Sequence, residues 1–208
     1  MNSNRMPLCT TMRLLGRFAL LFFALVASPV LWAHTFNGEV THGHSLLAGF
    51  MHPILGLDHL LVMVLVGVWS ALVLRPQRIW SAPLAFVCML TVGAVAGLMG
   101  VQTVWVEPMI AASLLVLGLL LASRLELPLS LMLCILGSFA VFHGMAHGSE
   151  LVQGDAFATL AGMVAATALL HFAGLGLGYA LLTRRRWQQV LGAAVAMVGG
   201  YSLLQLVV

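Results

Sequence analysis

The sequence "LPLSLMLCILGSFAVFHGMAHGSE", residues 127–150, begins as an apolar run and ends with ionisable side chains. No residue from Leu127 to Phe142 is charged, whereas His143, His147 and Glu150 follow directly. A helix that crosses a bilayer needs about 20 predominantly apolar residues, which this stretch provides. Ionisable groups at membrane depth are costly and usually face a cavity or a partner. The stretch therefore predicts a transmembrane helix with a functional end, the alternative being a polar fringe at the membrane interface.

The composition of the whole chain agrees with a membrane protein. Of its 208 residues, 62% are hydrophobic and only 7% are charged, and the mean hydropathy is +1.07. A soluble domain of this size cannot bury so much apolar surface, so the solvent is largely lipid. The net charge of +3 comes from scattered arginines without a basic patch, which excludes nucleic acid as a partner. The odd set Cys9, Cys88 and Cys134 predicts no disulfide or zinc framework.

Residues 1–33 have the pattern of a cleavable signal peptide. Arg5, Arg13 and Arg17 form a positive region, and the short apolar run "ALLFFALVASPVLWA" ends at Ala33. The alternative is an uncleaved first helix, because the residues before Ala33 are too large for a good cleavage site. Cleavage would place residue 34 outside the cytoplasmic membrane.

Six further apolar segments predict an all-α integral membrane protein with a six-helix transmembrane bundle. Short connections join them, so we expect one membrane domain over residues 55–208, preceded by a short outer segment with a re-entrant end over residues 34–54. The predicted spans are residues 55–74, 80–100, 104–123, 127–147, 156–182 and 187–207.

The arginines predict the orientation of these spans. If residue 34 lies outside, the loops after the first, third and fifth spans lie inside. These loops contain every arginine after residue 33, as the positive-inside rule requires. The outer side carries Glu39, Glu150 and Asp155 instead. Both ends of the mature chain are therefore predicted outside, in a multi-pass protein of the bacterial inner membrane. The inner arginines are Arg75, Arg78, Arg124, Arg184, Arg185 and Arg186.

A first polar motif, "HPILGLDHLLVM", occupies residues 52–63 at the start of the first span. Pro53 disfavours helix at His52, and Gly56 weakens the backbone further, so we expect a broken or re-entrant start. Asp58 and His59 then fall in the first regular turns. Asp58 as a helix cap and His59 as an interfacial hydrogen-bonding residue would be the structural alternative, which leaves His52 unexplained.

The second motif, "FHGMAHGSE" at residues 142–150, places His143, His147 and Glu150 on one helix face by their spacing. The predicted topology brings both motifs to the outer end of the bundle. Glu107, in the first turn of the third span, would lie at the same level, either as part of the site or as a carboxylate stabilised by the helix dipole. His171 lies about midway along the fifth span, where a buried structural histidine is the simpler interpretation.

Histidines and carboxylates gathered at one depth predict a site for a divalent transition-metal ion. Imidazole suits nickel, cobalt, zinc and copper, and no thiolate lies at that level. Because ligation requires neutral imidazole, binding should weaken below about pH 6.5. The predicted ligands are His52, Asp58, His59, His143, His147, Glu150 and Glu107. The nearby His34, His42 and His44 could collect metal, but a solvated, weakly ordered loop is the simpler expectation for residues 34–44.

The two motifs, together with the signal peptide and six spans, resemble the HupE/UreJ proteins. The resemblance covers the whole mature chain, and the poor cleavage site is its one departure. It implies a bacterial nickel or nickel–cobalt permease associated with hydrogenase or urease maturation. It also implies that the functional polar positions are His52, Asp58 and His59 of the first motif and His143, His147 and Glu150 of the second.

A permease is thus the leading hypothesis, with the metal ion as substrate, the bilayer as surroundings and no fixed cofactor. The chain has no Walker A motif, so it is not an ATPase. The alternative is an intramembrane metal-dependent hydrolase, although neither H-E-x-x-H nor G-x-S-x-G is present. A metal sensor or a bis-histidine haem protein is a further possibility. The sequence does not choose between nickel and cobalt, nor indicate the energy coupling or oligomeric state.

Overall fold

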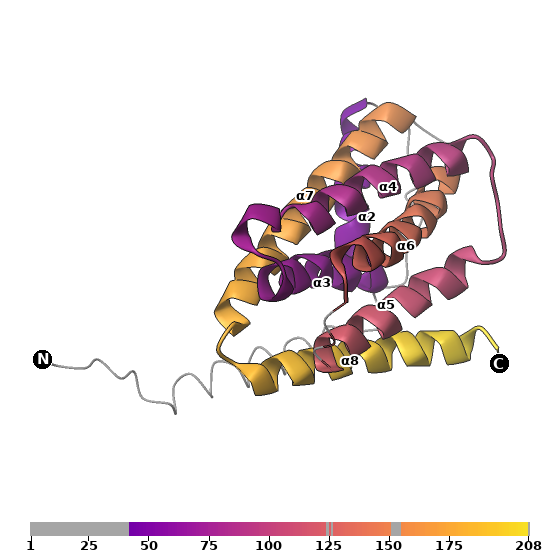
Figure 1. Cartoon of the computed structure of the whole chain (residues 1–208). Coiled ribbons are helices and arrows are strands. Elements are labelled where there is room, and N and C mark those ends of the chain that lie inside the picture. The colour runs from indigo at the N-terminus through magenta and orange to yellow at the C-terminus, as the bar shows by residue number, and fades with distance from the viewer. Residues whose placement is uncertain (1–41, 124, 126, 151–154, 208) are drawn as a thin grey trace, which may run out of the picture. The chain divides into compact units, whose positions relative to one another are not determined.

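The structure, a computed structural model, describes residues 42–123, 125, 127–150 and 155–207. The predicted signal peptide and residues 34–41 of the predicted outer segment lie outside the described residues. Within the described part of the chain, all regular structure is helical (Figure 1). The helices are α2 (His42–Leu55), α3 (Leu57–Val73), the 3₁₀ turn η2 (Pro76–Arg78), α4 (Ser81–Leu98), α5 (Val106–Ser123), α6 (Leu129–Glu150), α7 (Ala156–Leu181) and α8 (Arg185–Gln205).

Helices α3 to α8 occupy the six predicted spans, but fewer of them qualify as spans by length and composition. Helices α4, α5, α6 and α7 are long and apolar enough to cross a membrane, and the bent pair α2–α3 makes a fifth span if it is counted as one. Helix α8 does not qualify, because arginines and glutamines occupy its first turns. The described residues therefore support four or five spans where the sequence predicts six.

The predicted break at the start of the first span is present, but it lies four residues later than His52. Helix α2 continues through His52 and Pro53, and the chain bends by 78° between α2 and α3. Gly56, with φ of −77° and ψ of 112°, is the extended residue at the bend. Proline is tolerated in α2 because the helix ends only two residues after it. Residues 42–44, expected in a loop, form the first turn of α2.

Glycines allow the helices to pack in close pairs, as their spacing predicts. A Cβ on Gly93 would collide with the backbone of Val141, so α4 and α6 touch through their main chains. Gly192 and Gly118 make the same contact between α8 and α5. Gly200, predicted to pack as well, faces open space. Figure 1 shows α5 alongside α8 and α4 alongside α6.

Helix α7 is long enough to pack against both halves of the bent pair. Its residue Gly162 meets the backbone of α2, and Gly174 and Gly178 meet the backbone of α3. Gly174 lies against Val64 and Gly178 against Val68, so α3 and α7 run parallel. The loops after these two helices, which carry Arg75, Arg78 and Arg184–Arg186, therefore lie at the same end, as the positive-inside pattern requires. We call this end the arginine end.

A cavity of about 300 Å³ opens at the arginine end. Its lining includes Arg75 and Arg78 from the loop after α3, Trp69 from α3 itself, and Gln188 from α8. Gln188 is buried and donates a hydrogen bond from Nε2 to the Leu181 carbonyl at 2.8 Å, which ties the start of α8 to the end of α7.

Candidate metal-binding site

Four histidine rings from three helices meet at the end of the bundle opposite the arginine end. The ring centroids of His59 and His147 are 4.4 Å apart, and those of His59 and His143 are 5.0 Å apart. His52 joins them, with its ring 4.6 Å from His147 and 6.0 Å from His59. We call these four residues the histidine cluster. The prediction that both motifs lie at one end of the bundle is thus met by their side chains.

The backbone explains why these four rings meet. The bend at Gly56 turns the end of α2 back on the start of α3, which places His52 beside His59. On α6, His143 and His147 are one turn apart and face the same way. Neighbouring Gly144 and Gly148 let the backbone of α4 approach the opposite side of α6 so closely that any Cβ would collide with it.

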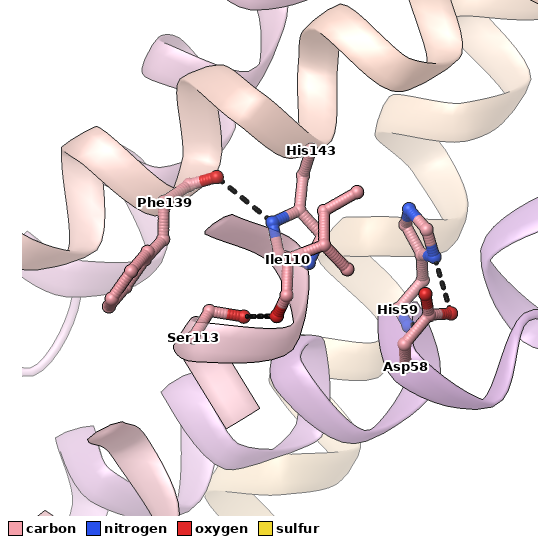
Figure 2. Close-up of polar contacts among 6 residues, drawn as sticks. All are labelled: Asp58, His59, Ile110, Ser113, Phe139 and His143. Carbon is pink, nitrogen blue, oxygen red and sulfur yellow. Dashed lines mark hydrogen bonds and ion pairs between the residues drawn. The ribbon is translucent and has the colours of Figure 1, made fainter. Parts of the chain in front are cut away.

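Two hydrogen bonds orient the rings (Figure 2). His59 Nδ1 donates to Asp58 Oδ1 at 2.7 Å, and the same oxygen accepts the His59 backbone N–H at 2.8 Å. His143 Nδ1 donates to the carbonyl oxygen of Phe139 at 2.9 Å. In both rings the proton on Nδ1 leaves Nε2 with a free lone pair. Metal-binding histidines typically have such a partner on the second ring nitrogen.

The free nitrogens are buried. His143 is 0% exposed, His147 2% and His59 7%, and the Nε2 atom of each has no hydrogen-bond partner. A buried polar atom without a partner costs about 1–3 kcal/mol, so three in one place call for a ligand that accepts their lone pairs. A metal ion fits, because neutral imidazole nitrogen is a common ligand of divalent transition metals.

The histidine cluster is not a finished coordination site. Its rings contact one another edge to face, and among the described residues no three His, Cys, Asp or Glu side chains are arranged to hold a metal ion directly. Turning the rings about their side-chain torsions would bring the Nε2 atoms onto one ion. The site therefore has the right donor atoms, in the right protonation state, without being rigidly preorganised.

The acidic residues predicted as ligands have different positions. Asp58 is half-buried and hydrogen-bonded to His59, so its observed role is to orient that ring. Glu107 lies exposed in the first turn of α5. Glu150 is the last residue of α6, one turn beyond His147. The roles of Glu107 and Glu150 as ligands stay predictions.

Sequence reasoning missed two residues that contact this site. The Phe139 carbonyl, which orients His143, carries no sequence signal beyond its position four residues earlier on a helix. Phe86 of α4 lies with its ring centroid 6.0 Å from His143 and 5.4 Å from His171. As an apolar residue in an apolar run, it could not be distinguished from the surrounding core. His171 is buried, as expected, but it lies outside the histidine cluster.

Comparison with known proteins explains the two motifs. The model of the HupE/UreJ protein family matches residues 20–202 of this chain. The chain belongs to the HupE/UreJ family. The sequence is also 39% identical to Protein HupE of Rhizobium leguminosarum bv. viciae over 186 residues, which cover 87% of this chain and 94% of the relative. No solved structure matches the chain. As a HupE/UreJ protein with several apolar helices, it is a multi-pass membrane protein.

Proposed function

We propose that this HupE/UreJ protein is a permease of the bacterial inner membrane that carries a divalent transition-metal ion inward, nickel first and cobalt second. The imported ion would supply the maturation of a metalloenzyme such as hydrogenase or urease. The observation that carries this proposal is the set of three buried, unpartnered Nε2 atoms of His59, His143 and His147. Family membership supports transport over the alternative of an intramembrane hydrolase.

The donor atoms favour a transition metal over the more abundant hard cations. Magnesium and calcium prefer oxygen ligands, whereas imidazole suits nickel, cobalt, copper and zinc. Three imidazoles in an apolar, buried setting would replace the water that an ion must leave behind. The half-buried His52 and Asp58 lie at the edge of the cluster, where an arriving ion would first meet protein ligands.

The loose geometry of the cluster suits transport. Conduction requires an ion to bind well enough to enter but weakly enough to leave. A rigid set of three or four imidazoles would hold nickel or zinc for long periods, as structural metal sites do. Here the rings must turn to bind and can turn back to release, while Asp58 and Phe139 keep the tautomers of His59 and His143 fixed.

The direct test is uptake of radioactive nickel by cells that lack their own nickel transporters. Wild-type protein should give uptake above background, and His147→Ala and Asp58→Ala should lower it about tenfold or more. Cys134→Ala is a matched control, because Cys134 lies exposed on the same helix as His147. All variants are compared at equal amounts in the membrane. Absence of wild-type uptake at nickel concentrations too low for leakage would exclude a nickel permease.

A further inference from the structure

A second group of buried polar atoms lies on α7. His171 is 1% exposed and Thr167, one turn earlier, is 0% exposed. Neither ring nitrogen of His171 nor the Thr167 hydroxyl makes a well-aligned hydrogen bond, although the Thr167 carbonyl acts on the ring as a weak acceptor. Each such buried atom costs about 1–3 kcal/mol. A purely structural histidine would be expected to satisfy at least one nitrogen, so this pair needs a different explanation.

This pair lies deeper in the bundle than the histidine cluster. A Cβ on Gly67 of α3 would collide with the His171 carbonyl, so the two residues are at the same level. Gly67 is eight residues beyond His59, which is about 12 Å nearer the arginine end at 1.5 Å per residue. Side chains tilt toward the start of their helix, so the His171 ring points back toward the histidine cluster.

The Phe86 ring separates the two sites. It is fully buried and contacts His143 on one side and His171 on the other, at centroid distances of 6.0 and 5.4 Å. Its contacts join α4 to α6 and to α7 at one point. An ion passing from one set of nitrogens to the other would have to displace a single aromatic side chain.

Helix α3 offers a further donor along the same line. Met63 is one turn beyond His59 and one turn before Gly67, and it is 0% exposed. A thioether is a weak, soft ligand that can contact a transition-metal ion without trapping it. The face of α3 thus leads from His59 past Met63 to the level of His171.

We propose that His171 and Thr167 form an inner station for the transported divalent transition-metal ion, with Phe86 as the gate between this station and the histidine cluster. The inference rests on the proposed function, since it gives the ion a second stop on an inward path. Two stations of moderate affinity release an ion faster than one strong site, because each transfer is short and partly compensated. From His171 the remaining distance leads to the cavity at the arginine end.

The test compares His171→Leu, which keeps the volume but not the nitrogens, with His171→Cys, which restores a soft ligand. We expect nickel uptake to fall about tenfold or more in His171→Leu and to recover in part in His171→Cys. Purified protein is also titrated with Co²⁺, followed by its visible absorption. The wild type should show a tighter and a weaker class of site, His171→Leu should lose the weaker, and His147→Ala the tighter.

The two proposals fail in different ways. If wild-type cells take up no nickel, the proposed function is wrong, and the Co²⁺ titration alone then decides whether His171 binds metal. If the wild type transports and His171→Leu equals it in uptake and titration, the inner station is excluded. Equal losses in His171→Leu and His171→Cys, with membrane amounts and the tighter Co²⁺ site unchanged, would also overturn it, because they would show a role in packing.

Discussion

The Nδ1 atom of His143 donates a hydrogen bond to the carbonyl oxygen of Phe139, one turn earlier on α6, at 2.9 Å. A carbonyl can only accept, so the proton is on Nδ1 and the buried Nε2 keeps its lone pair. On α3, the Asp58 carboxylate fixes the same tautomer in His59 at 2.7 Å. Two helices thus use different acceptors, one from the backbone and one from a side chain, to present the same ligand atom.

Replacing the Asp58 carboxylate by an amide should weaken, but not abolish, metal binding. In Asp58→Asn the amide oxygen can still accept from His59 Nδ1, but it lacks the charge that makes the ring more basic. Loss of such an orienting partner costs about 10–100-fold in metal affinity. We expect Asp58→Asn to lie between the wild type and Asp58→Ala in a Co²⁺ titration. Affinity in Asp58→Asn equal to the wild type would show that the charge has no role.

Gly56→Ala should disturb the site while leaving the fold intact. The backbone angles of Gly56 are accessible to alanine, but the added Cβ would lie 3.2 Å from both Asp58 Oδ1 and His59 Nδ1. Small displacements of binding groups are expensive, so we expect a loss of about three- to tenfold in uptake. Gly176→Ala, which adds a methyl group into open space, is the control. Equal uptake in both variants would contradict the assignment.

Helix packing gives a prediction about stability within α8. In Gly192→Ala the new Cβ would collide with the backbone of α5, whereas Gly200→Ala on the same helix meets nothing within 4 Å. Overpacking costs about 1–3 kcal/mol, so Gly192→Ala should lower the thermal unfolding temperature of the purified protein. Gly200→Ala should leave it unchanged or raise it slightly, because alanine has the higher helix propensity. Equal unfolding temperatures would show that α5 and α8 do not pack through these glycines.

Most of the helical architecture could be predicted from apolar length alone, since a span is a long run without charge. The same criterion is ambiguous for α8, whose first turns are polar and whose assignment depended on the pattern of alternating sides. The break was predicted near His52 because proline restrains the preceding residue. The helix instead ends at Gly56, since a proline near a helix end costs little.

The histidine cluster was predictable because the arginine pattern placed both motifs at one end of the bundle. What the sequence could not show was which atoms of these residues are free. The difference between Asp58, which orients a ring, and His147, whose Nε2 is unpartnered, depends on side-chain geometry. Phe86 was missed for a similar reason. Its importance lies in touching His143 and His171 from another helix, and no local pattern encodes such a contact.

The imidazole-rich site predicts a selectivity pattern. Cobalt should inhibit nickel uptake at similar concentrations, because the affinities of the two ions for one ligand set are close. Magnesium should not inhibit even in large excess, since it prefers oxygen ligands and loses its water reluctantly. Uptake of radioactive nickel measured against each competitor tests this. Strong inhibition by magnesium would point to a carboxylate site and away from the histidine cluster.

The position of the C-terminus tests whether α8 is the sixth span. Alkaline phosphatase folds only where its disulfides form, outside the cytoplasmic membrane. With six spans, a fusion at the C-terminus should be active, like one after Gln102 between α4 and α5, whereas a fusion after Arg78 should be inactive. Helix α8 packs along α5, which favours a crossing helix, but its polar first turns would also suit a helix on the inner surface. An inactive C-terminal fusion beside correct results at the two internal sites would place α8 there, and the bundle would have five spans.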